Sequence, residues 1–527
     1  MDAISINQDE ITERSGQILR MRGIYARASK VTVWLGPESK DSQKAFQFIE
    51  MLHNRSKMFE GWVKDPSTGG WIKESSGFAT WFQESLLRRR YSHEWQAVYQ
   101  LLRRAWWKRI WIVQEMVAAK NVVLFCGDQT LEPIHLSGFF DLLVAHGIMY
   151  LPLLSKLEGI VLEYDTFSLA RAYLRQETWK GVSLLQALYR TGMSLSSEPR
   201  DKIYAVLNLA QDGDKIVPKP DYSLSIRQIY IQLVVSMVQE TGRLDVLSLA
   251  GLPVYPRILD INLPTWAPDW TYRVTSTINS SIGDVKPVWA DRNSHAVVAF
   301  HNDSNIMKAC GLIVDTVDGL AQSIAVSDHG TSTDCLHQST SRSNPYIGWG
   351  AVDAIWRSLV ADLIPSGQRN SYEALSLFLR QCRSSSFITT PLLKPFTFTN
   401  WYKLNKSLVV AGRTIEDWGN DRSIPWTDGG LEPEGNETDL FHYRLASHWQ
   451  SRRFLTTMKG YAGLGPLTSR PGDKICVILG CCTPVLLREI DGHFEVVGEC
   501  YLHGIMHGEA MIDFDAGKYE LKDFEIW

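Results

Sequence analysis

The sequence predicts an open parallel α/β sheet at the N-terminal end, then a mainly helical region, then a small β-rich C-terminal region. Strands and helices alternate through about the first 50 residues, which is typical of parallel strands joined by crossover helices. Apolar residues recur at helical spacing across residues 130–250, and short β-branched runs separated by turns follow Phe454. The predicted regions are 1–128, 129–290, 291–450 and 451–527.

The N-terminal elements follow from local patterns. Residues 2–6 read as the end of a buried strand, and the polar run 7–10 is typical of a helix start. The β-branched run 31–35 predicts a second strand, which Gly36-Pro37 stops, and residues 45–52 outline the next amphipathic helix. The first helix carries one apolar stripe, made of Ile11, Ile18, Met21, Ile24, Tyr25 and Ala28.

Further elements follow the same logic. Helices are predicted at 81–89 and 94–107, a helical run at 109–117, and a strand at 121–126. The Pro- and Trp-rich stretch 263–270 predicts a packed non-helical link. Surface loops are predicted at 322–345 and 413–440, and short strands at 474–479, 483–489 and 493–499 around the turn Asp491-Gly492.

Composition limits the class of protein. The chain has 527 residues, 45% hydrophobic and 21% charged, which predicts globular domains. Its net charge of -4 disfavours nucleic acid, and Glu84, Glu94 and Glu115 interrupt or follow the basic stretch 88–109. No apolar run approaches the ~20 residues of a membrane span, and no signal-peptide pattern opens the chain. The eight cysteines form no C-x-x-C pair, so a cytoplasmic protein with reduced thiols is expected.

Three blocks in order resemble the heterokaryon incompatibility (HET) domain of filamentous fungi. Residues 1–8 (MDAISINQ) resemble its "WIDAICINQ" segment, and residues 104–115 (RAWWKRIWIVQE) resemble its "RPWFxRxWVxQE" block. The helix and strand that follow the first block also match, at Glu13, Gln17, Met21, Ile24, Tyr25, Ala28 and Val33 to Gly36. Segments common behind HET domains are matched by 199–205 (PRDKIYA), 264–270, 460–466, 472–473 and 498–504.

The sequence also departs from the family pattern. Ser5 stands where cysteine is usual, Ala105 where proline is usual, and Trp107 where phenylalanine is usual. The family pattern begins upstream with an "ALSYxWG" strand and a further helix, which have no counterpart here. We therefore expect an N-terminally truncated HET domain with an incomplete sheet.

The resemblance implies a fold similar to TIR domains, whose roles are NAD cleavage or scaffold signalling in cell death. A nucleotide-cleaving site needs a carboxylate beside the scissile glycosidic bond, which makes Glu115 the first catalytic candidate and Glu13 and Asp2 the next. The predicted ligand-binding residues are Arg104 and Arg109 for phosphate oxygens, Trp111 for stacking on a base, and the amides of Asn7, Gln8 and Gln114. No resident cofactor is expected, NAD being a possible substrate. No metal site is expected either, because Gly504 and Gly508 interrupt the pair His503-x-x-x-His507.

Plainer interpretations stay open. Glu115 also fits an ordinary carboxylate at the start of a helix, and Glu13 fits the solvated face of a helix. The tryptophans also fit core positions. The function expected from the resemblance is fungal nonself recognition, with the HET region as a cell-death effector or signalling scaffold acting through protein partners or self-association. An NAD(P) glycohydrolase and an inert degenerate paralogue are the alternatives.

Overall fold

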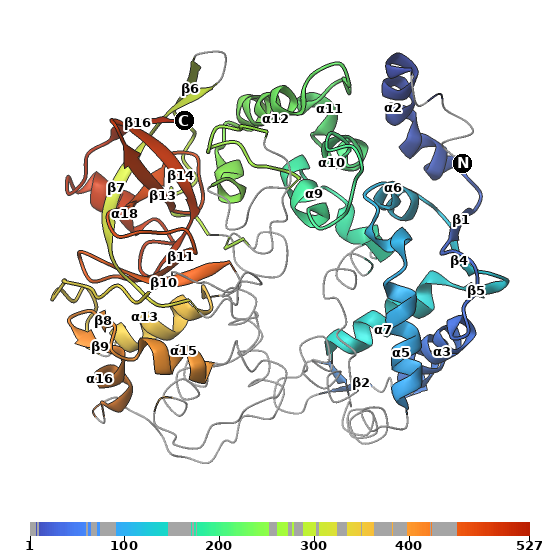
Figure 1. Ribbon diagram of the computed structural model, residues 1–527, viewed down its shortest axis with the longest axis horizontal. Coiled ribbons are helices and arrows are strands. Elements are labelled where there is room, and N and C mark those ends of the chain that lie inside the picture. Colours follow the sequence, from blue (N-terminus) through green and yellow to red (C-terminus); the bar gives the residue numbers. More distant parts are fainter. Residues whose placement is uncertain are drawn as a thin grey trace. The chain divides into compact units, whose positions relative to one another are not determined.

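The computed structural model describes two compact units, Met1–Ser223 and Leu224–Trp527 (Figure 1). The described residues are 7, 10–58, 62–64, 71–73, 91–145, 170, 173–174, 176–251, 261–271, 277–278, 288–301, 305–323, 335–348, 350–362, 382, 398–421, 423 and 451–527. Within them, no helix combines the length and apolar character that a bilayer crossing requires.

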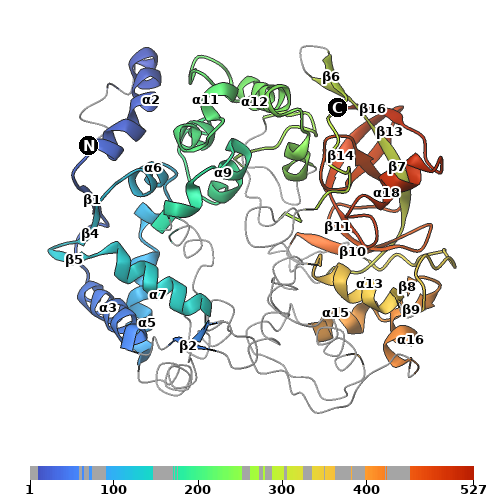
Figure 2. The same ribbon diagram turned by 180° about the vertical axis from the view of Figure 1, so that it is seen from behind.

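Unit 1 contains a parallel strand pair, formed by the predicted strands 31–35 and 121–126, while the strand predicted at 2–6 lies outside the described residues. β1 (Val31–Trp34) pairs in parallel with β4 (Val122–Cys126), in the register Val31↔Val122 to Trp34↔Phe125, and the two lie side by side in both views (Figure 2). β5 (Gln129–Leu131) then turns back antiparallel on β4, so the sheet β1-β4-β5 is mixed. Positive φ at Gly127 allows this tight reversal.

Helices pack against this small sheet, and further helices follow it in the chain. α3 (Ser42–Met58) packs against α5 (Ser92–Leu102) and α7 (Pro133–Ala145), burying Phe48 against Trp95. The remaining described elements of unit 1 are α2 (Ile11–Arg27), β2 (Trp62–Lys64), β3 (Trp71–Lys73), η3 (Ala105–Lys108), α6 (Ile112–Val117), η6 (Gln176–Trp179), α9 (Leu184–Thr191), α10 (Asp201–Tyr204), η7 (Leu207–Leu209) and α11 (Gly213–Ile216). Between Pro133 and Leu249 every described element of the chain is a helix, as the apolar spacing across residues 130–250 predicts.

The predicted helix 94–107 is shorter than its apolar pattern indicates. α5 ends at Leu102, and a separate 3-10 turn, η3, carries Trp106 and Trp107. The indole N–H of Trp107 donates to the carbonyl of Leu101 over 3.1 Å. That bond adds to the backbone N–H groups that also reach this carbonyl at the helix end, so the side chain helps to stabilise the break. The predicted helix 81–89 lies outside the described residues.

The β-rich C-terminal region is a barrel centred on one long strand. β7 (Ile306–Leu320) pairs antiparallel with β12 (Lys474–Ile478) and with β16 (Lys522–Ile526). β12 pairs with β13 (Val485–Ile490), β13 with β14 (His493–Glu499), and β14 with β16, so the ring of pairings closes.

Further strands extend the barrel sheet. β7 also pairs with β6 (Val298–His301) and with β10 (Arg452–Thr457), while β11 (Ala462–Pro466) continues from β10 to β15 (Tyr501–Leu502). The other described elements of unit 2 are α12 (Ile226–Thr241), η8 (Asp245–Leu249), α13 (Gly350–Leu359), α15 (Phe398–Asn405), β8 (Val409–Val410), β9 (Arg413–Thr414), α16 (Ile415–Asn420) and α18 (Glu509–Asp515).

The stretch 263–270 is non-helical and packed, as its proline and tryptophan content predicts. Trp266 is fully buried, and Thr265 ties the stretch to the barrel. The backbone N–H of Thr265 donates to the carbonyl of Trp527 over 2.9 Å, and its hydroxyl accepts from the N–H of Val496 over 2.9 Å. One side chain thus joins the link to β14 and to the last residue of the chain.

A non-helical segment, residues 335–348, is held against β7 by the carboxylate of Asp318. That carboxylate accepts from the hydroxyls of Ser339 and Thr340 and from the N–H groups of Thr340 and Ser341, over 2.6–3.1 Å. Burial alone would raise the pKa of Asp318, but these hydrogen bonds outweigh it and hold the pKa below its ordinary value.

This arrangement predicts a pH dependence. Because the folded-state pKa of Asp318 is depressed, its contribution is present above the ordinary aspartate pKa and is lost as pH falls through the folded value. We expect amide protection in 335–348 to fall in that acidic window, after correction for the intrinsic exchange rate, while an Asp318→Asn variant has already lost it at neutral pH. Hydrogen exchange measured from pH 7 downward checks this, and equal, pH-independent protection in both proteins would contradict it.

Candidate functional site

The first predicted site residues fall partly outside the described part of the chain. Asp2 and Gln8 are among the residues left undescribed. Asn7 is exposed, and its backbone N–H donates to Oε1 of Glu13 over 3.4 Å. Glu13 lies in the first turn of α2, where a carboxylate meets the positive end of the helix dipole. The structure therefore brings Asn7 and Glu13 together at the start of α2.

Arg104 fixes the loop that follows β1. One guanidinium nitrogen donates to the carbonyls of Leu35 and Pro37, each over 2.9 Å, and the other donates to the hydroxyl of Ser42 over 3.2 Å. Gly36 lies beneath it with a φ of 108°, and a Cβ there would lie 3.0 Å from the guanidinium. These bonds hold the β1–α3 turn in place. They engage the Arg104 guanidinium, which was predicted to bind phosphate oxygens.

Residues 108–119 are hydrogen-bonded at several points to residues 176–205, a contact that we call the α6 clamp. In the backbone, the N–H of Ile110 donates to the carbonyl of Leu195 over 2.9 Å, and the N–H of Leu195 donates to the carbonyl of Lys108. The amide of Gln176 donates to the carbonyls of Met116 and Ala119 over 2.6 and 2.9 Å. The clamp thus holds both ends of α6.

Trp111 and Gln114 belong to this clamp. The indole N–H of Trp111 donates to Oδ2 of Asp201 over 3.0 Å. The fully buried amide of Gln114 donates to the carbonyl of Ala205 over 2.8 Å, while its Oε1 has no partner among the described residues. Glu115 follows in the first turn of α6 and is half-buried, whereas Arg109 is exposed.

Asp201 is the centre of a compact polar group, the Asp201 cluster. Its buried carboxylate accepts from the Tyr222 hydroxyl over 2.5 Å and from the Arg14 guanidinium over 3.4 Å, besides Trp111. Arg14 lies over the Tyr222 ring, 3.9 Å from its centroid. Arg14 comes from α2 and Trp111 precedes α6, so a single carboxylate bonds two segments of the N-terminal region at once.

A second ion pair completes the Asp201 cluster. Arg200 pairs with Glu198 through two hydrogen bonds of 2.7 and 2.9 Å and also donates to the carbonyl of Tyr222. Tyr204 packs edge-on against the Tyr222 ring at 5.0 Å. Two guanidinium groups and two carboxylates make the cluster neutral overall, which is how charges are accommodated away from water.

Burial governs the acid–base properties of the Asp201 cluster. Burial raises the pKa of Asp201, although the hydrogen bonds from Tyr222 and Trp111 act in the opposite direction. Burial also raises the pKa of Tyr222, and the neighbouring Asp201 charge adds to that shift. The Tyr222 phenol therefore stays protonated and acts as a fixed donor to Asp201.

The sequence did not single out Arg14, Glu198, Arg200, Asp201, Tyr204 or Tyr222 as site residues. The segment 199–205 was identified by resemblance alone. Its signal is nevertheless present in the residue types, because three charged side chains stand next to an apolar run. Lys202, the third of them, is buried and donates to the carbonyls of Gly192 and Ser194. Charges placed this way indicate buried polar contacts with another segment.

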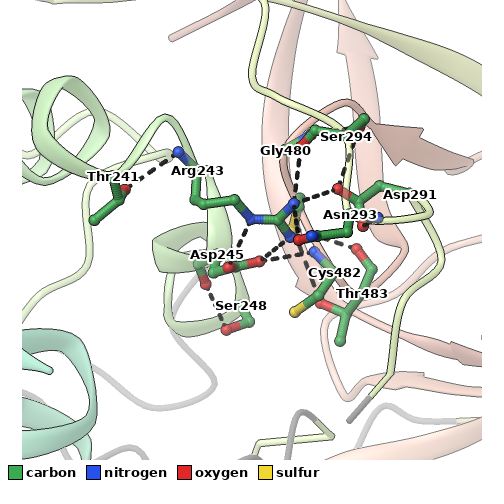
Figure 3. Close-up of polar contacts among 11 residues, drawn as sticks. Thr241, Arg243, Asp245, Ser248, Asp291, Asn293, Ser294, Gly480, Cys482 and Thr483 are labelled. Atoms are coloured by element: carbon green, nitrogen blue, oxygen red, sulfur yellow. Dashed lines mark hydrogen bonds and ion pairs between the residues drawn. The ribbon is translucent and has the colours of Figure 1, made fainter. Parts of the chain in front are cut away.

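A separate polar cluster lies in unit 2 (Figure 3). Arg243 follows α12 and donates to Asp291 over 2.8 Å and to both carboxylate oxygens of Asp245 over 3.1 Å. Asp245 in turn accepts from the N–H of Cys482 over 2.8 Å, so the guanidinium links the end of α12 to the β12–β13 connection. The side chain of Asp291 is fully buried, and its carboxylate is paired with the Arg243 guanidinium.

Comparison with known proteins covers both ends of the chain. Residues 1–115 match the family model of the heterokaryon incompatibility protein (HET) domain, and residues 431–520 match the Het-6 beta-barrel domain. The chain is 24% identical to "Heterokaryon incompatibility protein 6, OR allele" of Neurospora crassa, in an alignment that covers 100% of this chain and 82% of the relative. No solved structure matches.

Proposed function

We propose, from the premise that this chain is a heterokaryon incompatibility (HET) domain protein, that it acts in fungal nonself recognition. In this role the HET region is a cell-death effector that works as a signalling scaffold, through protein partners or self-association. We further infer a cytoplasmic setting, because the eight cysteines are sparse for the length of the chain and form no C-x-x-C pair, a usage typical of reducing compartments.

The observation that carries the scaffold mode is the α6 clamp. Arg104 and the amide N–H of Gln114 are two of the donors expected to hold a nucleotide, and both donate to groups of this chain. Trp111, predicted to stack on a base, likewise has its indole N–H bonded to Asp201. A preformed nucleotide site needs donors directed at the ligand, since breaking an internal hydrogen bond to bind one costs affinity. Here the donors are already bonded to groups of the same chain. This favours a protein that recognises partners through its folded surface over one that cleaves a bound nucleotide.

Glu115 is the residue on which the enzymatic alternative depends. We expect overexpression in a filamentous fungus to cause cell death equally with wild type and Glu115→Gln, because a scaffold needs the helix and not the charge. We also expect neither purified protein to release nicotinamide from NAD. Nicotinamide release by wild type that is lost in Glu115→Gln would replace the scaffold with a TIR-like NAD(P) glycohydrolase.

An exposed cationic residue supplies the matched control for this experiment. Lys120→Gln changes an exposed charge just beyond α6, at a residue with no predicted part in the site, so it separates loss of Glu115 chemistry from a general change of surface charge. If no version causes death while all remain folded and soluble, the chain is an inert paralogue and the proposed role fails.

A further inference from the structure

α2 is a weakly built helix that carries part of the HET signature. Its N-cap residue, Glu10, makes no side-chain capping bond, and Gly16 and Gly23 lie within it. A Cβ at either glycine would have open space around it, so no close packing in this unit requires them. Glycine is among the least favourable helix residues, and helices of this kind depend on tertiary contacts for their stability.

Few of the described side chains of α2, those of residues 12–27, are buried. The buried ones are Ser15, Ile18 and Met21, whereas Leu19 and Ile24 are 42% and 58% exposed. A full amphipathic stripe would bury the larger aliphatic side chains, so burial alone holds this helix poorly. Specific polar contacts must therefore supply much of what keeps α2 in place.

Two polar contacts join α2 to the segment 199–209. Arg14 reaches Asp201 and the Tyr222 ring, and the amide of Asn208 donates to the carbonyl of Ile18 over 2.9 Å. The Arg14 side chain is 25% exposed and its bond to Asp201 is 3.4 Å long, in contrast to the 2.5 Å bond from Tyr222. The contact with α2 is thus the longest of the three side-chain hydrogen bonds described for Asp201.

We propose that α2 is a releasable helix, latched by Asp201 and Asn208 in the resting protein, and that opening this latch is the step that activates the HET region. This inference rests on the proposed function and names its regulation. Asp201 keeps its bonds to Tyr222 and Trp111 when Arg14 leaves, so the latch opens without exposing a bare carboxylate. Release uncovers the faces of α6 and η7 on which α2 packs, together with Ile18 and Met21.

Two variants open the latch from opposite sides. Arg14→Gln removes the bond that α2 makes to Asp201, and Asn208→Ala removes the bond that the 199–209 segment makes to α2. Arg20→Gln is the matched control, since Arg20 is an exposed arginine on the same helix. Hydrogen exchange of the α2 amides is measured against those of α6, in the full chain, and the same versions are expressed in a filamentous fungus under a graded promoter.

We expect about tenfold faster exchange in α2 for both release variants, from the loss of one charged or buried hydrogen bond, with α6 unchanged and Arg20→Gln like wild type. The release variants should also cause death at a lower expression level than wild type. Unchanged exchange in α2 overturns the latch, and faster exchange with an unchanged death threshold overturns its activating role. If exchange in α2 responds as expected but no version causes death, the proposed function is overturned. Asp201 then only stabilises the position of α2.

Discussion

Replacing Arg243 with alanine is expected to destabilise unit 2 by about 3–5 kcal/mol, the usual cost of removing one partner from a buried ion network. The substitution leaves Asp291 buried and Asp245 without its bidentate partner, and it cuts the connection between α12 and the β12–β13 turn (Figure 3). Hydrogen exchange of the α12 and β12 amides in increasing urea measures the loss within this unit.

Arg292→Ala is the matched control for that experiment. Arg292 is also paired with an aspartate, Asp515, over 2.9 Å, but both side chains are more than half exposed. Exposed ion pairs contribute less than about 1 kcal/mol to the free energy of unfolding, so the urea midpoint of unit 2 should hardly move. If both substitutions shift the urea midpoint equally, burial of the Arg243 network does not have the energetic weight assigned to it.

Gly213→Ala is expected to destabilise unit 1 by several kilocalories per mole. A Cβ at Gly213 would lie 2.1 Å from the carbonyl oxygen of Leu207 and 2.9 Å from its carbon. Because the obstacle is backbone, relief requires moving η7 or α11, and overpacking of this kind costs about 1–3 kcal/mol or more. Amide exchange of η7 and of the neighbouring 201–205 segment should accelerate accordingly.

The opposite sign is expected for Gly16→Ala, which makes the same chemical change in α2. Nothing lies within 4 Å of a Cβ there, so alanine should stabilise the helix by about 1 kcal/mol and slow exchange in α2. Destabilisation at Gly16, or tolerance at Gly213, would show that the packing around these two glycines differs from that described.

Local patterns were sufficient wherever neighbouring residues decide the structure. The strand 31–35, the strand 121–126 and the turn Asp491-Gly492 are confirmed, because β-branched runs and left-handed turn residues act within a few positions. The helix 94–107 was wrong at its C-terminal end, since the break depends on where the indole of Trp107 folds back.

The site was less accessible to sequence reasoning. Residue types drew attention to Trp111, Gln114 and Arg104, and all three do make specific polar contacts. The partners of Trp111 and Gln114 could not be anticipated, because Asp201 and Ala205 lie 90 and 91 residues further along the chain. No periodicity or spacing links positions so far apart.

By itself, the sequence predicted the β-rich C-terminal region, the strands 31–35 and 121–126, and the resemblance to the HET domain that the family comparison also finds for residues 1–115. Only the tertiary structure decided that β7 is the central strand of the barrel and that Asp201 bonds both Arg14 and Trp111. The physical reason is the range of the interactions. Propensity and turn chemistry act between near neighbours, whereas strand pairing and charge compensation are settled only when distant segments meet in space.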